Sequence, residues 1–175
     1  MPASVRIARL SAGLYWLCSL LMAVLPVVVL WGLATSVADP GWMAARFADL
    51  PAVTRMTPGK AALANGIGAV SLPVLLLTFA QMRGLFARYR QGEILSDPCA
   101  LHVLRIGQSL VVLAGLGVLL PTLQRLALTF DNPPGARVLA IGLDSGSLGM
   151  ALAGGLLVVI GWVMREASRE LAEFV

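Results

Sequence analysis

The chain consists of four long apolar blocks separated by shorter polar stretches. The blocks run from about Leu10 to Val37, Ala61 to Met82, Ala100 to Leu123 and Ser145 to Met164. A helix of roughly 20 residues crosses a hydrocarbon core of about 30 Å, and no block carries Asp, Glu, Lys or Arg in mid-span. Barrel strands are about 10 residues long and alternate in polarity, which these blocks do not. The pattern predicts an all-α integral membrane protein, a four-transmembrane-helix bundle forming a single domain over residues 1–175.

The polar segments define the predicted connections. We expect outer loops at 38–60 and 124–144, an inner loop at 83–99, and a cytoplasmic helical tail at 165–175. The first block also resembles a secretory signal. A signal has an apolar core of only about 7 to 15 residues, so the length of the block favours a retained first helix.

The first outer loop has an amphipathic stretch. Trp42, Met43, Phe47 and Leu50 fall roughly on one side of a short helix, which suits a segment anchored at the membrane interface by aromatic residues. Arg46 falls inside the same arc, so a plain structured loop is an equally good interpretation.

Composition and charge support the membrane class and predict an orientation. The chain is 58% hydrophobic and 13% charged, outside the usual balance of a soluble domain. Positive charges concentrate beside the cytoplasmic ends of spans, so we expect both termini in the cytoplasm. The predicted cytoplasmic side then carries eight basic residues: Arg6, Arg9, Arg83, Arg88, Arg90, Arg105, Arg165 and Arg169. The other side carries five: Arg46, Arg55, Lys60, Arg125 and Arg137.

The formal net charge of +4 is best interpreted as topology and contact with phospholipid. Direct nucleic-acid binding is not expected, since there is no basic domain outside the membrane and no aromatic residues interleave with the arginines.

Residues typical of catalysis or metal binding are sparse. The chain has one histidine, His102, and its two cysteines, Cys18 and Cys99, form no CxxC pair. No acidic pair and no nucleophile beside a base stands out. We therefore expect no enzyme activity, no cofactor and no metal site. Inside the spans Asn65 and Gln108 are expected to be interhelical hydrogen-bond partners rather than a substrate site, and His102 is either an ordinary interfacial residue or a pH sensor.

Two features of the spans predict local shape and packing. Pro26 and Pro73 lie near the middle of the first and second spans, where each removes a backbone hydrogen bond and favours a kink. Ser147, Ala151 and Gly155 form a small-residue row at i, i+4 and i+8 that allows close helix packing. The neighbouring helix belongs either to the same chain or to a second copy in a homodimer.

The inner loop, GEILSDPCALHVLRIG, has the signals of a helix end followed by a helix start. Gly92 is typical of the residue after a helix, and Ser96, Asp97 and Pro98 are typical of an N-cap and first turn. The connection is short enough to place the second and third spans side by side and antiparallel.

The fourth span continues into MREASRELAEFV, an amphipathic helical tail. This tail either packs against the inner loop of its own chain or docks a partner. The candidate partner-binding residues of the loop and tail are Arg88, Arg90, Gly92, Glu93, Ile94, Ser96, Asp97, Arg165 and Arg169.

The inner loop and the closing GWVMREASRELAEF together resemble the bacterial membrane family called domain of unknown function 2975. The matching residues are Gly92, Glu93, Ile94, Ser96, Leu104, Ile106, Gly107, Arg165, Glu166 and Leu171. The resemblance implies a small four-span inner-membrane protein encoded beside a Cro-type helix-turn-helix regulator, which it holds or modulates at the membrane. Members commonly continue into a longer acidic tail, whereas this sequence ends at Phe174-Val175.

Three classes of function remain. The first is a regulatory or scaffolding inner-membrane protein whose cytoplasmic face binds a soluble partner such as a small transcriptional regulator. The second is a small transporter or channel subunit, or a lipid-binding protein, for which a cavity lined by Asn65, Gln108 and Gln124 would be evidence. The third, a membrane enzyme, ranks last.

Overall fold

The computed structural model describes residues 3–48, 50, 56–93, 96–133, 137 and 142–173. The helices are α1 (Ala3–Ala38), α2 (Pro40–Arg46), α3 (Pro58–Ala69), α4 (Ser71–Arg90), α5 (Asp97–Thr129) and α6 (Ser145–Glu173). No strand occurs among the described residues. Four stretches are long and apolar enough to span a membrane: Arg9–Ala38, Pro58–Arg90, Asp97–Thr129 and Ser145–Glu170. The predictions of an all-helical fold and of four helices of spanning length are confirmed.

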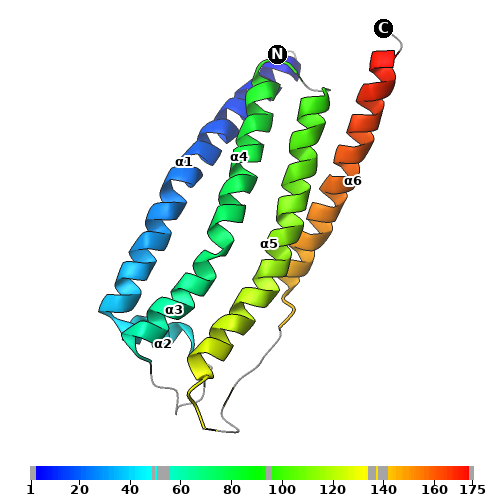
Figure 1. The fold of residues 1–175 in the computed structure, drawn as a ribbon. Coiled ribbons are helices and arrows are strands. Elements are labelled where there is room, and N and C mark those ends of the chain that lie inside the picture. The colour runs from blue at the N-terminus through cyan, green and yellow to red at the C-terminus, as the bar shows by residue number, and fades with distance from the viewer. Residues whose placement is uncertain are drawn as a thin grey trace.

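The long helices pack as an open row in which neighbours in the chain lie side by side (Figure 1). α1 packs on α3 and α4, α4 packs on α5, and the most extensive packing joins α5 to α6. Among the described elements, α6 packs extensively only on α5. The start of α1 and the end of α6 lie at one end of the molecule, which we call the terminal end, and α2 lies at the other, which we call the α2 end (Figure 1).

The surface of the described helices is as apolar as their interior, unlike the surface of a soluble protein. Large apolar side chains face outward along α1 and α6, with Leu152 75% exposed and Leu30 65% exposed. Besides leucines such as Leu128, the buried residues include small or polar ones: Ser36, Ala61 and Ala64 have no exposed surface. Lipid tails are as apolar as leucine, so helices in a bilayer associate through small residues and hydrogen bonds. The pattern suggests a membrane protein.

The predicted second span consists of two helices, α3 and α4, separated at Val70. Pro73 has no N–H group with which to bond the Ala69 carbonyl, and its ring crowds that carbonyl. The chain tightens instead: the Val70 N–H donates to the Ile67 carbonyl at 3.2 Å, and the Ser71 hydroxyl donates to the Gly68 carbonyl at 2.9 Å. At Pro73, where the sequence predicts a kink, the structure thus has a break between α3 and α4.

The other intramembrane prolines do not divide their helices. α1 continues without interruption through Pro26. α5 continues through Pro121, a proline to which the sequence analysis assigned no kink.

In the connection between α4 and α5, the end of α4 and the start of α5 largely follow the signals in the sequence. Gly92 has a φ of 84°, a conformation that glycine adopts without steric cost, and its N–H donates to the Tyr89 carbonyl at 3.2 Å. Ser96 occupies the N-cap position of α5, but its side chain makes no capping hydrogen bond, and its buried Oγ has no hydrogen-bond partner among the described residues. The expected Ser96 side-chain cap is therefore wrong. At the start of α6 the Asp144 carboxylate does accept from the Ser147 N–H at 3.2 Å, and hydrogen bonding to Ser147 lowers the pKa of Asp144.

Glycines bring the α5 and α6 backbones into direct contact. A Cβ placed on Gly107 would lie 2.7 Å from the Gly154 carbonyl oxygen and from the Val158 nitrogen. A Cβ on Gly161 would lie 2.8 Å from the backbone of Leu104. No real Cβ tolerates these distances, so this interface depends on glycine.

The predicted small-residue row on α6 is only partly correct. Ser147 lies in the α5 interface, where a Cβ on Gly117 would approach its Oγ to 2.8 Å, whereas a Cβ on Gly155 would meet nothing within 4 Å. The interface row runs through Ser147, Gly154 and Gly161, seven residues apart. A step of four residues turns about 40° past a full helical turn and a step of seven falls only about 20° short of two turns, so the heptad row follows the neighbouring helix for longer.

Candidate functional site

A cavity of about 670 Å³ lies towards the α2 end. Its walls come from α1, α2 and the residue that follows it, both sides of the α3–α4 break, and α5. The volume lies within the range of about 300 to 1,000 Å³ that is usual for small-molecule pockets. Val28 and Trp31 line the cavity and are both largely exposed, so the cavity opens to the surface along α1.

The walls of the cavity are mostly apolar. Eight of the 17 lining residues are leucine, valine or aromatic: Leu25, Val28, Val29, Trp31, Trp42, Phe47, Leu72 and Leu75. The break at Val70 borders this lining, because Gly68, Ala69 and Ser71 all contribute to it. An irregular backbone at membrane depth is tolerated where it is buried in protein or lines a cavity, and this break does line one.

Two side-chain amides frame the cavity. The Asn65 Nδ2 donates to the Gly32 carbonyl of α1 at 2.6 Å, and the Gln124 Nε2 of α5 donates to the Ala64 carbonyl of α3 at 2.8 Å. A Cβ on Gly68 would approach the Gln124 amide to 2.8 Å, so glycine makes room for this contact. Each amide nitrogen uses one N–H on a backbone carbonyl, so each amide keeps a second N–H and its oxygen for a ligand.

Charged groups stand at the α2 side of the cavity. Asp39 and Arg46 both line it and are exposed. The Asp39 carboxylate accepts from the Gly41 N–H at 2.9 Å. The cavity therefore combines an apolar body, amide acceptors and, near α2, one carboxylate and one guanidinium.

The predicted intramembrane polar residues separate in the structure. Asn65 lines the cavity and bonds α1, whereas Gln108 lies on an exposed part of α5 outside the cavity lining. The expected interhelical role is confirmed for Asn65, and no interhelical bond involves Gln108 among the described residues. Gln124, which the sequence analysis placed in the same potential cavity, does line it.

Four of the nine predicted partner-binding residues form two ion pairs at the terminal end. Arg88 bonds Glu93 at 3.0 Å and Arg165 of α6 bonds Asp97 of α5 at 3.0 Å. The second contact joins the tail to the inner loop of its own chain. Arg169 is exposed, and Ile94 lies outside the described residues.

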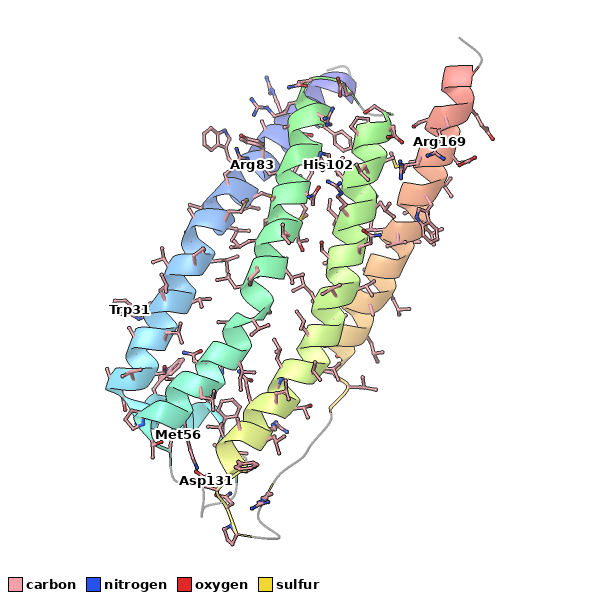
Figure 2. All side chains as sticks on the ribbon, in the orientation of Figure 1. Trp31, Met56, Arg83, His102, Asp131 and Arg169 are labelled. Carbon is pink, nitrogen blue, oxygen red and sulfur yellow. The ribbon has the colours of Figure 1, made fainter. Side chains whose placement is uncertain are left out.

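Two contacts were not predicted. His102 Nδ1 lies 2.7 Å from the Gln81 Oε1 of α4, and a Cβ on Gly84 would come within 2.6 Å of the His102 ring. At the α2 end the Lys60 ammonium lies 3.2 Å from the Asp131 carboxylate and donates to the Leu128 carbonyl at 3.3 Å. Figure 2 shows His102 near the terminal end and Asp131 near the other. Neither pairing could be inferred without knowing which helices are neighbours.

The described residues contain no group of three or more His, Cys, Asp or Glu side chains able to hold a metal ion. Over its described residues the structure thus defines an all-helical protein with four helices of spanning length and a cavity of ligand size beside the α3–α4 break. Comparisons with protein-family models, with curated proteins and with solved structures find no match for this chain.

Proposed function

We propose that this is a non-enzymatic inner-membrane protein that binds a small amphipathic molecule in the cavity beside the α3–α4 break. The observation that carries the proposal is the cavity itself: about 670 Å³, with an apolar lining interrupted by Asn65 and Gln124. The chemistry of the lining favours an alkyl or ring body with a polar head that exchanges hydrogen bonds with the two side-chain amides, since an amide both donates and accepts. Asp39 and Arg46 suit a polar head near α2. The ligand class is therefore lipid-like.

The proposal predicts that filling the cavity abolishes ligand capture. Leu75→Trp places a larger side chain in the lining, whereas Leu77→Trp places the same ring on an exposed α4 position outside it. Membranes containing either variant are irradiated with a photoreactive monoacylglycerol analogue, and the crosslinked peptides are quantified by mass spectrometry. We expect crosslinks on α1 and α4 to fall about tenfold in Leu75→Trp, which corresponds to about 1.4 kcal/mol, and to persist in Leu77→Trp. Crosslinks spread evenly over all lipid-facing helices and unchanged by Leu75→Trp would contradict the proposal.

A second candidate function is docking of a soluble regulator at the terminal end. The observation that favours it is the projection of α6: Arg165 pairs with the first residue of α5, and the helix continues for two further turns to Glu173. Glu166, Arg169 and Glu170 on this projection are exposed. With both termini in the cytoplasm, the projection would face a small helix-turn-helix protein of the kind implied by the family resemblance.

This second candidate is tested by two double reversals of charge. Asp97→Arg with Arg165→Glu exchanges the partners of an internal ion pair, whereas Glu166→Lys with Arg169→Glu alters only exposed residues of the projection. Binding of the full-length protein in nanodiscs to a purified Cro-type regulator from the same organism is measured by biolayer interferometry. We expect the Glu166/Arg169 variant to weaken binding about tenfold and to change its salt dependence, since charge pairs at an interface steer association. Equal affinity for wild type and both variants would exclude docking through this projection.

A further inference from the structure

Two arginines of α4 converge on one tyrosine of α1 at the terminal end. The Arg83 guanidinium carbon lies 5.0 Å from the centroid of the Tyr15 ring, and that of Arg90 lies 5.3 Å from the same centroid. The two arginines are seven residues apart and hence on one face of α4, about 10 Å apart along its axis. The Tyr15 ring is therefore in contact with both guanidinium groups. Figure 2 shows Arg83 on the side of α4 that faces α1.

This pair of positive charges has no acidic partner among the described residues. The nearby Arg88 differs, because it is neutralised by Glu93 at 3.0 Å. Contact with an aromatic face holds a guanidinium in place without cancelling its charge. Both Arg83 and Arg90 are exposed. Two fixed and uncompensated guanidiniums on one ring are a favourable site for an anion, and the planar fork of arginine matches the oxygens of a phosphate.

A shallow groove adjoins Arg83. It measures about 320 Å³ and is lined by Tyr15, Ala80, Arg83, Gly84 and Ala87. Ala80, Gly84 and Ala87 form its floor of small residues on α4, so apart from Tyr15 and Arg83 its side chains offer only apolar surface. A free phosphate ion would gain nothing from that surface, whereas the glycerol and upper acyl chains of a phospholipid would cover it.

The neighbourhood of Tyr15 also matches the depth at which headgroups lie. Trp16 packs edge-on against Tyr15, with ring centroids 5.9 Å apart, and is itself 69% exposed. Exposed tryptophan and tyrosine are characteristic of the level of the lipid headgroups. From Tyr15 towards the α2 end, α1 continues with exposed leucines and valines such as Leu20 and Val24.

From these observations we propose that Arg83 and Arg90, held by Tyr15, bind the phosphodiester headgroup of an anionic phospholipid in the groove between α1 and α4. The site is separate from the cavity near α2 and does not depend on the function proposed for that cavity. It recognises the charge of the headgroup, and so discriminates phosphatidylglycerol from phosphatidylcholine.

The test is native mass spectrometry of the full-length protein, released from nanodiscs containing equal amounts of phosphatidylglycerol and phosphatidylcholine. Wild type is expected to retain phosphatidylglycerol preferentially. In Arg83→Gln with Arg90→Gln the ratio of retained phosphatidylglycerol to phosphatidylcholine is expected to fall about tenfold. Arg105→Gln, which removes an exposed arginine from α5, serves as the matched control and should leave the ratio within about twofold. Circular dichroism establishes that each variant keeps the helical fold.

Two further variants isolate the tyrosine. Tyr15→Phe keeps the aromatic face and should preserve the ratio, whereas Tyr15→Leu frees both guanidiniums and should lower it. An unchanged ratio in the double arginine variant, or an equal loss in Arg105→Gln, would overturn the proposal. Displacement of the retained lipid by millimolar inorganic phosphate would also overturn it, because the site would then recognise a soluble anion.

Discussion

Replacement of Gly154 by alanine is expected to destabilise the protein, and replacement of the adjacent Gly155 by alanine is expected to stabilise it. A Cβ on Gly154 would lie 2.8 Å from the Gly107 carbonyl oxygen and 3.0 Å from the Leu110 Cβ, so α5 and α6 must move apart. Overpacking of this kind typically costs about 1–3 kcal/mol. A Cβ on Gly155 meets nothing within 4 Å, which leaves only the gain of about 1 kcal/mol in helix propensity.

The measurement is the free energy of unfolding in mixed micelles, followed by circular dichroism as denaturing detergent is added. Both substitutions add one methyl group to the same helix, so differences in composition cancel. Gly107→Ala, on the opposite side of the interface, should be destabilising as well, since its Cβ would meet backbone atoms of α6 at 2.7 Å. If Gly154→Ala and Gly155→Ala changed the free energy of unfolding by the same amount, the close packing of α5 on α6 would be wrong.

The contrast between these glycines shows which level of structure the sequence could predict. The four helices follow directly from the length of the apolar blocks, because an apolar stretch of that length has few other stable forms. The sequence does not show which face of each helix packs against its neighbours, because the lipid-facing side of a membrane helix is as apolar as its buried side. Only small residues can then indicate which face of α6 packs on α5, and α6 has several overlapping rows of small residues. The i, i+4 spacing favours the row through Gly155, whereas in the structure the heptad row through Gly154 and Gly161 faces α5.

The candidate sites also combine features that the local sequence predicts with features that depend on which helices are neighbours. The ends of α4 and α5 were predictable from local signals such as Gly92, because helix termination depends on residues close in sequence. The cavity was not predictable as a whole, because its lining comes from residues as distant as Leu25 and Gln124. Asn65 and Pro73 were conspicuous in the sequence, yet only the packing of α1, α3 and α5 places an amide and a helix break beside the same space. Gln81 and His102 were likewise separate until α4 and α5 proved to be neighbours.

At the terminal end, arginines without an acidic partner indicate a binding site better than arginines in ion pairs do. Arg88 and Arg165 have internal acidic partners at 3.0 Å, and exposed ion pairs of this kind stabilise a fold by at most about 1 kcal/mol. They fasten the loop and the tail to the bundle. Arg83 and Arg90 are held by an aromatic ring instead. Their charge is left for the solvent, a partner or the headgroups of the bilayer.

A single cysteine at the end of α4 is expected to be protected from the outside of intact cells, and one beyond the end of α5 is expected to be accessible. The positive-inside rule supports this orientation, since Arg83, Arg88 and Arg90 cluster within the last turns of one span. Gln91→Cys and Pro133→Cys place the probes at exposed positions of the terminal end and the α2 end, respectively. Both are made in a background carrying Cys18→Ser and Cys99→Ser. The serine at position 99 keeps a donor for the Glu93 carbonyl, which the Cys99 thiol contacts at 3.2 Å.

An impermeant maleimide should label Pro133→Cys in intact cells and Gln91→Cys only after the membrane is permeabilised. The reverse result would place the terminal end outside, and α6 could then not dock a cytoplasmic regulator. Labelling of both cysteines in intact cells would contradict a chain that crosses the membrane four times with both termini on one side. The orientation matters for the lipid site too: with the terminal end inside, Arg83 and Arg90 face the anionic cytoplasmic leaflet, where each basic residue near the surface contributes about 1 kcal/mol of binding. The labelling pattern therefore tests whether the arginine site and the proposed docking projection face the compartment in which each could act.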